Sequence, residues 1–149
     1  MPEASSPLAL DVAVRGAALD ILTINHSRQP TRVWDRSNSW GWETLTLELG
    51  VSPRSEDCYP LTGKPIAFTR NGPGFTEIPP GGMQRVTVSA GNPEWNGIER
   101  IEHLRGQTLW VRACLRILPS PEAETYGIFV GEVSSPRRES QPPHRWLFT

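Results

Sequence analysis

Cysteine is scarce in this sequence, which has only Cys58 and Cys114 among its 149 residues. Two thiols do not make the disulfide framework that staples small secreted domains. No Cys-x-x-Cys pair and no cysteine–histidine spacing of the zinc-binding kind is present. The sequence therefore predicts free thiols in a reducing compartment, with a single bridge between the two as the alternative. It predicts no metal and no cofactor.

Neither sign of charge is in excess, since 15 basic residues nearly balance 16 acidic ones. Nucleic-acid binders usually carry a basic excess because phosphate contacts dominate their affinity, so nucleic acid is disfavoured as a partner. No apolar run approaches the roughly 20 residues that cross a membrane. The start of the chain, Met-Pro-Glu-Ala-Ser-Ser-Pro, lacks a basic segment followed by an apolar core. These features predict a cytoplasmic protein with no membrane partner.

Proline and glycine are plentiful, with 15 and 13 copies, as suits short strands joined by many turns. Strict alternation of apolar and polar residues predicts strands at 8–15, 44–49 and 108–118. Shorter strands are expected at 19–24, 31–34, 65–69, 75–78, 85–88 and 126–130. Residues 91–105 fit a helix, a single helical turn or a bent loop. About eight strands without long intervening helices predict an all-β, antiparallel sandwich.

The predicted strands lie within 1–134, which we interpret as one β-sandwich domain. Residues 135–149 form a polar C-terminal tail that ends in an aromatic tip with Trp146 and Phe148. Polar ends of chains are commonly flexible. The aromatic tip offers two further hypotheses, docking onto its own domain or binding to a partner.

Two segments carry a resemblance to a known family. Leu22-Thr-Ile-Asn25, the turn at Gln29-Pro30 and Arg32-Val-Trp34 resemble the second and third strands of bacterial immunoglobulin-like domains. Ile78-Pro-Pro-Gly-Gly82 before Arg85-Val-Thr-Val88 is similar to a later step in those domains, and the layout is similar to that of the intracellular proteinase-inhibitor family. The resemblance implies an immunoglobulin-like sandwich. Because the cysteine pair that joins the two sheets of true immunoglobulin domains is missing, no functional residue is carried over.

A segment with two tryptophans is the main candidate for a binding site. Trp40 and Trp42 flank a glycine, with Arg36, Asn38 and Glu43 close by. Indole rings with amide and charged neighbours bind peptide segments or sugars, because a flat rigid ring supplies contact area at low entropic cost. The competing interpretation is that these rings cap an open end of the core. A second candidate surface is the outer face of 108–118, where Trp110, Arg112, Cys114 and Arg116 follow one another.

Signals of catalysis are weak. The three histidines His26, His103 and His144 are predicted in a turn, in the ambiguous 91–105 segment and in the tail. The loop nucleophiles Ser37, Ser39 and Cys58 lack a flanking signature such as Gly-x-Ser-x-Gly.

The leading hypothesis is thus a non-enzymatic protein–protein interaction module that uses loops at one end of a β-sandwich. A carbohydrate-binding module and a hydrolase with fold-assembled Glu and His residues are the alternatives. The oligomeric state stays open.

Overall fold

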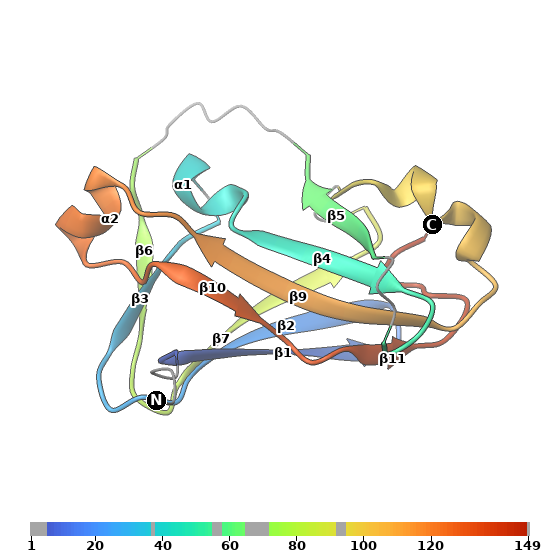
Figure 1. The fold of residues 1–149 in the computed structure, drawn as a ribbon, viewed down its shortest axis with the longest axis horizontal. Coiled ribbons are helices and arrows are strands. Elements are labelled where there is room, and N and C mark those ends of the chain that lie inside the picture. The colour runs from blue at the N-terminus through green and yellow to red at the C-terminus, as the bar shows by residue number, and fades with distance from the viewer. Residues whose placement is uncertain (1–5, 37, 55–57, 65–71, 92–94, 149) are drawn as a thin grey trace.

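The computed structural model describes residues 6–36, 38–54, 58–64, 72–91 and 95–148. Most of the regular structure in these residues is antiparallel strand, which confirms the predicted all-β class. The strands form a three-stranded sheet, a six-stranded sheet and a two-stranded ribbon (Figure 1). The strand predicted at 65–69 lies outside the described residues.

The three-stranded sheet has the order β1 (Leu8–Arg15), β2 (Ala18–Asn25), β7 (Met83–Ser89). The six-stranded sheet contains β4 (Leu45–Gly50), β5 (Tyr59–Gly63), β8 (Trp95–Asn96), β9 (Leu109–Ile117), β10 (Gly131–Ser134) and β11 (Arg138–Ser140). Its order is β10-β9-β4-β5-β8, and β11 follows β10 along the same edge of β9. The ribbon pairs β3 (Thr31–Trp34) with β6 (Phe75–Ile78). The helical segments are α1 (Ser39–Trp42), α2 (Pro121–Tyr126) and the 3-10 turns η1 (Ile98–Arg100) and η2 (Glu102–Leu104).

The two larger sheets face each other and share one apolar core (Figure 1). Because side chains alternate along a strand, every second residue of β1 and β9 points into that core. The inward positions that the alternation predicts are buried, namely Leu8, Leu10 and Val12 on β1 and Leu109, Val111, Ala113, Leu115 and Ile117 on β9. Cys114, on the outward face of β9, is buried as well. The opposite face of the six-stranded sheet is left for polar side chains.

The helix α2 ends at Tyr126, where a strand was predicted to begin. Ser120 caps its first turn by accepting a hydrogen bond from the Ala123 amide, and Pro121 fits the first helical position. Gly127, with φ 64°, ends the helix in the left-handed conformation. The prediction of a strand at 126–130 is therefore wrong, and β10 begins at Gly131.

The C-terminal tail also differs from its prediction, because residues 138–148 belong to the domain. Strand β11 pairs with β9, and Arg138 of β11 forms a two-pronged ion pair with Asp11 of β1. The segment predicted as a polar tail thus contributes a strand to the six-stranded sheet and the buried side chains of Trp146, Leu147 and Phe148 to the core. A buried aromatic tip supplies the apolar contacts that the polar sequence before it lacks.

The remaining predictions concern smaller features. Residues 91–105 contain two 3-10 turns, in agreement with the helical-turn alternative rather than a full helix. Cys58 and Cys114 do not form a disulfide bond with each other. Of the helices in the described residues, none has the length and apolar character needed to cross a membrane.

Candidate functional site

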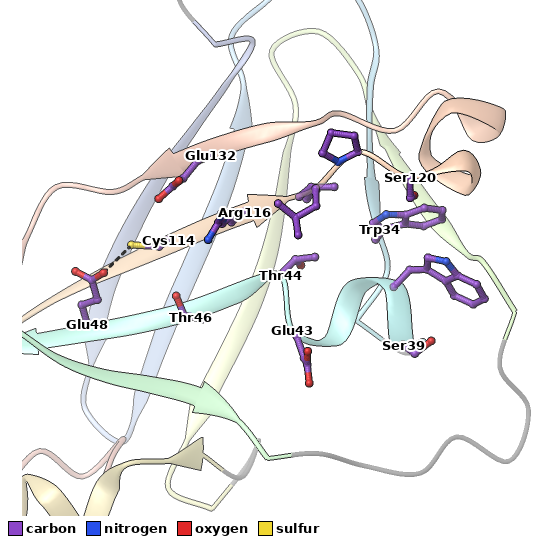
Figure 2. A pocket seen from close by; sticks show the side chains of 14 residues that line it. Trp34, Ser39, Glu43, Thr44, Thr46, Glu48, Cys114, Arg116, Ser120 and Glu132 are labelled. Atoms are coloured by element: carbon purple, nitrogen blue, oxygen red, sulfur yellow. Dashed lines mark hydrogen bonds between the residues drawn. The ribbon is translucent and has the colours of Figure 1, made fainter.

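A cleft of about 580 Å³ lies on the outer face of the six-stranded sheet. Figure 2 shows its lining side chains, which come from β4, β9 and β10, from α1, and from the segment between β9 and α2. Residues of α1 and the segment that leads into α2 line the cleft, and these two helices lie at the same end of the molecule (Figure 1). It therefore combines a polar sheet surface with a helical end wall.

Strand register builds the floor of the cleft in rows. Thr46 of β4 lies opposite Cys114 of β9, and Cys114 lies opposite Ser134 of β10. In the neighbouring row Arg116 lies opposite Glu132. These residues share one face because they stand two apart along their strands, so the pleat points them all outward.

The end wall of the cleft is apolar and partly exposed. Trp34, buried at the end of β3, packs against Trp40 of α1 with their ring centroids 6.1 Å apart. The ring of Trp40 is half-buried, and Leu118, which also lines the cleft, is 61% exposed. Exposed apolar side chains that gather around a concave surface mark a contact site more strongly than isolated ones do.

The charged groups of the cleft fall into two kinds. Glu48 is held by Arg112, whose Nε and Nη2 lie 2.7 and 2.6 Å from Oε2. In contrast, the exposed side chains of Glu43, Arg116 and Glu132 form no ion pair with any residue that the structure describes. With two glutamates and one arginine among these side chains, the cleft carries a net negative charge. Each of the three can form an ion pair with an oppositely charged group of a ligand.

Cys114 is a poor nucleophile despite its place in the cleft. Its Sγ lies 3.6 Å from Glu48 Oε1 and accepts a hydrogen bond from Ser134 at 3.4 Å. Burial is the main cause that raises the pKa of the Cys114 thiol, and the charge of Glu48 adds to it. The thiolate is therefore disfavoured, and this cysteine stays in its unreactive protonated form.

The one-turn helix α1 sends its two tryptophans in opposite directions. Residues two apart on a helix are rotated by about 200°, whereas on a strand they share a face. Accordingly Trp40 lines the cleft, while Trp42 lies against the guanidinium of Arg36 and donates from Nε1 to the Lys64 carbonyl. The predicted Trp40–Trp42 pair is thus not a single binding platform.

Gly41 is the reason that this helix can form where it does. A Cβ on Gly41 would lie 2.0 Å from the carbonyl oxygen of Asp35, so only glycine lets α1 pack on the chain that leaves β3. Gly63 is similarly close to Trp42, where a Cβ would be 3.1 Å from Nε1. The glycine between the tryptophans therefore has a packing role that the sequence did not reveal.

The other residues predicted around the tryptophans have different environments. Asn38 is buried and structural: its side chain caps α1 by accepting from the Gly41 amide and donates to the Gly74 carbonyl, both at 3.0 Å. Glu43 is exposed and lines the cleft. Arg36 is partly buried between indole rings and lies outside the cleft lining.

The aromatic tip is part of the core rather than a binding surface. Trp146 is fully buried and Phe148 is 7% exposed. Trp146 donates from Nε1 to Ser140 Oγ at 3.0 Å, and His144 bridges Ser140 Oγ and the Gln107 carbonyl at 2.7 Å each. With Nε2 donating to the carbonyl and Nδ1 accepting from the hydroxyl, one neutral tautomer satisfies every group. The tip therefore packs onto its own domain, as one of the two hypotheses for it proposed.

The candidate catalytic residues are not brought together. His26 and His103 are exposed, His144 is buried in the tip, and none of the three lines the cleft. Ser39 lies at the cleft edge, Cys58 interacts with Arg137, and Ser37 lies outside the described residues. The described residues contain no group of three or more His, Cys, Asp or Glu side chains that is arranged to hold a metal.

Several cleft residues were absent from the sequence-based list of candidates. Thr46 and Glu48 lie on a predicted strand, and their outward side follows from the alternation. Leu118 ends the predicted strand 108–118, whose outer face had already supplied Cys114 and Arg116 as candidates. Glu132 had no such signal, because the course of the chain around α2 was predicted incorrectly. Comparisons with protein-family models, curated proteins and solved structures find no match to this chain.

Proposed function

We propose that this protein is a non-enzymatic interaction module of immunoglobulin-like β-sandwich architecture that binds a short extended segment of a protein partner in the cleft. The architecture is supported by two facing antiparallel sheets whose pairings β2–β7 and β4–β9 join strands far apart in sequence. The observation that carries the proposal is the half-buried ring of Trp40 beside the exposed side chain of Leu118, at one end of a polar groove.

The composition of the cleft indicates the chemistry of the segment. An apolar or aromatic side chain of the partner fits between Trp40 and Leu118, where it removes both from water. A basic side chain next to it pairs with Glu43 or Glu132, and an acidic one further along pairs with Arg116. The expected ligand is therefore a peptide with an apolar residue followed by a basic one.

Carbohydrate binding remains the second candidate, because the ring of Trp40 stands beside carboxylates that accept hydrogen bonds from hydroxyl groups. The exposed aliphatic Leu118 favours a peptide over a sugar, since an aliphatic side chain makes no stacking platform. A hydrolase has less support. Glu48 is engaged by Arg112, the pKa of Cys114 is raised, and no histidine reaches the cleft.

The test is selection of linear peptides from a random display library on the full chain, followed by affinity measurement with synthetic peptides. We expect enrichment of an apolar–basic motif. Trp40→Ala should weaken binding about 30-fold or more, which is the loss typical of a central aromatic anchor. Glu132→Lys should slow association, because it reverses a charge at the rim.

Trp110→Ala is the matched control, because Trp110 lies on the outer face of β9 but not in the cleft lining. It should bind selected peptides as the unaltered chain does, and denaturation midpoints verify that each variant folds. Peptides that bind equally well to Trp40→Ala would contradict the proposal. Binding to a glycan array without peptide binding would establish the carbohydrate alternative instead.

A further inference from the structure

The outward side chains of β9 and β10 make three steps along the cleft. Leu118, just past the end of β9, is 61% exposed. Two residues back along β9, Arg116 lies opposite Glu132 of β10 (Figure 2). After two more residues, Cys114 lies opposite Ser134. Outward side chains on one strand are roughly 7 Å apart, so an apolar, a charged and a small polar step follow one another at that spacing.

Strand β7 carries side chains of matching chemistry in the same order. Within the described residues β7 pairs with β2 alone, so it is an edge strand. Its outward side chains Met83, Arg85 and Thr87 are all exposed, whereas the alternate residues point toward the core. These three side chains are also roughly 7 Å apart. β7 thus presents an apolar, a basic and a small polar group that can meet the three steps of the cleft.

The exposed apolar side chains single out the same two places. The described residues contain four large apolar side chains that are exposed, namely Val51, Met83, Leu118 and Val130. Of these four, Met83 alone lies on a strand, and a basic residue follows it by two positions. Single exposed apolar side chains are ordinary on a protein surface. Met83 and Leu118 differ from that case, because each lies one step from an exposed charge and the two charges have opposite signs.

The two charges are available to each other. Glu132 forms no ion pair with any residue that the structure describes. The Arg85 Nε lies 4.0 Å from Asp20 Oδ2, but the Nε of Arg15 holds that oxygen at 2.5 Å. The side chain of Arg85 is 59% exposed. A strand that lies on the β10 side of the cleft would bring Arg85 to Glu132 rather than to Arg116.

We propose that the cleft binds strand β7 of a second copy of this chain. The inference rests on the proposed function, because it names the partner that supplies the extended segment. Met83 of the second copy packs on Leu118 and Trp40, its Arg85 pairs with Glu132, and its Thr87 lies over Cys114. In this register, β7 of the second copy runs antiparallel to β9.

The position of the two surfaces determines the kind of assembly. The cleft lies on the outer face of the six-stranded sheet, and the exposed side chains of β7 lie on the outer face of the three-stranded sheet. These faces point in opposite directions, so two copies cannot use both contacts at once. Such a head-to-tail contact builds rings or open chains instead of a closed dimer. A contact between one strand and one cleft is small, so the association should be weak.

The test is analytical ultracentrifugation of the full chain from about 10 µM to about 1 mM. We expect the average mass to rise with concentration beyond that of a dimer. Met83→Glu and Leu118→Glu should each stay monomeric. Val51→Glu, which alters another exposed apolar residue, is the control and should associate as the unaltered chain does. Because all three positions are exposed, the variants should keep the denaturation midpoint of the unaltered chain.

An equal mixture of Met83→Glu and Leu118→Glu is the decisive sample. The first variant keeps an intact cleft and the second keeps an intact β7, so the mixture should form a dimer and stop there. A monomeric mixture would overturn the proposal, and so would an unaltered chain that stays monomeric throughout the concentration range.

Peptides selected on the cleft separate this inference from the proposed function. A peptide that occupies the cleft should displace β7, so its addition should return the unaltered chain to monomers. If a peptide binds and its binding needs Trp40 while the assemblies persist, or while the chain alone is monomeric, the proposed function stands and this inference is wrong. If no peptide binds and the chain is monomeric, both are wrong.

Discussion

Two aromatic segments of this protein have similar sequences and opposite roles. Residues 40–42 and 146–148 each contain two large aromatic side chains next to charged residues. Trp146 and Phe148 are buried in the core, whereas Trp40 is partly exposed at the wall of a cleft. The difference lies in what surrounds each segment. The C-terminal tip is held by hydrogen bonds that join Trp146, Ser140, His144 and the Gln107 carbonyl. The helix α1, in contrast, packs on Asp35, just after the end of β3.

This comparison teaches that aromatic content alone does not identify a binding surface. The ring nitrogen of Trp146 has a hydroxyl partner inside the protein, and its ring is fully enclosed. The ring of Trp40 rests on Trp34 with one side toward the cleft. Mutations should therefore separate the two segments, with stability lost at the tip and binding lost at α1.

The largest effect is expected from Trp146→Ala. Removing a fully buried indole leaves a cavity and removes one of the two hydrogen bonds of Ser140 Oγ, so we expect a loss of about 3–5 kcal/mol in the free energy of unfolding. Urea denaturation followed by circular dichroism measures it. Arg145→Ala, at an exposed neighbour, should change the stability by less than about 0.5 kcal/mol. If Trp146→Ala does not fold, Trp146→Phe is the milder substitution to measure. If Trp146→Phe is as stable as the unaltered chain, the indole of Trp146 is not both buried and hydrogen-bonded as described.

An intermediate effect is expected from Gly41→Ala, which tests the packing of α1. The added methyl group would overlap the Asp35 carbonyl, and forcing extra atoms into a packed site costs about 1–3 kcal/mol. Because α1 must move, the cleft should also lose peptide affinity. Gly106→Ala is the control, since its Cβ would meet no neighbouring atom. If Gly41→Ala matches Gly106→Ala in both stability and binding, the close packing of α1 on Asp35 is wrong.

The smallest effect is expected from the Asp11–Arg138 ion pair, which attaches β11 to the edge of β1. The hydrogen bond from Arg138 is the main cause that lowers the pKa of Asp11 below its usual value. The pair therefore stabilises the fold above about pH 3.9, the usual pKa of an unfolded aspartate, and this contribution is lost as the pH falls through the lowered value. Both side chains are partly exposed, so solvent screening keeps the contribution of this pair small.

Denaturation of the unaltered chain and of Asp11→Asn between pH 6 and about pH 2.5 measures this pair. The two free energies of unfolding should differ at pH 6 and converge toward the acid end. A difference that stays constant with pH would show that Asp11 contributes through packing rather than charge. Compared with the effect of Trp146→Ala, the outcome also shows whether the surface ion pair or the buried tip contributes more to the free energy that holds the C-terminal segment on the domain.

Much of the strand structure could be predicted because it depends on short-range alternation. The ranges 31–34 and 75–78 match β3 and β6, and the inward positions of β1 and β9 match the buried residues. A strand that buries one face must alternate, so its pattern is visible in a few residues. The outward polar side of β4 and β9 was visible for the same reason, although not the fact that it forms a cleft.

Other features depend on partners distant in sequence, and only the tertiary structure decided them. The β11 segment, Arg138–Ser140, is polar and three residues long, and it becomes a strand because the edge of β9 is open beside it. Trp40 and Trp42 point apart because Asn38 caps a helical turn that packs on Asp35. The sequence by itself determined the all-β class and which residues face the core. The placement of each tryptophan, at a cleft, against Arg36 or within the core, follows from contacts between segments that no local pattern records.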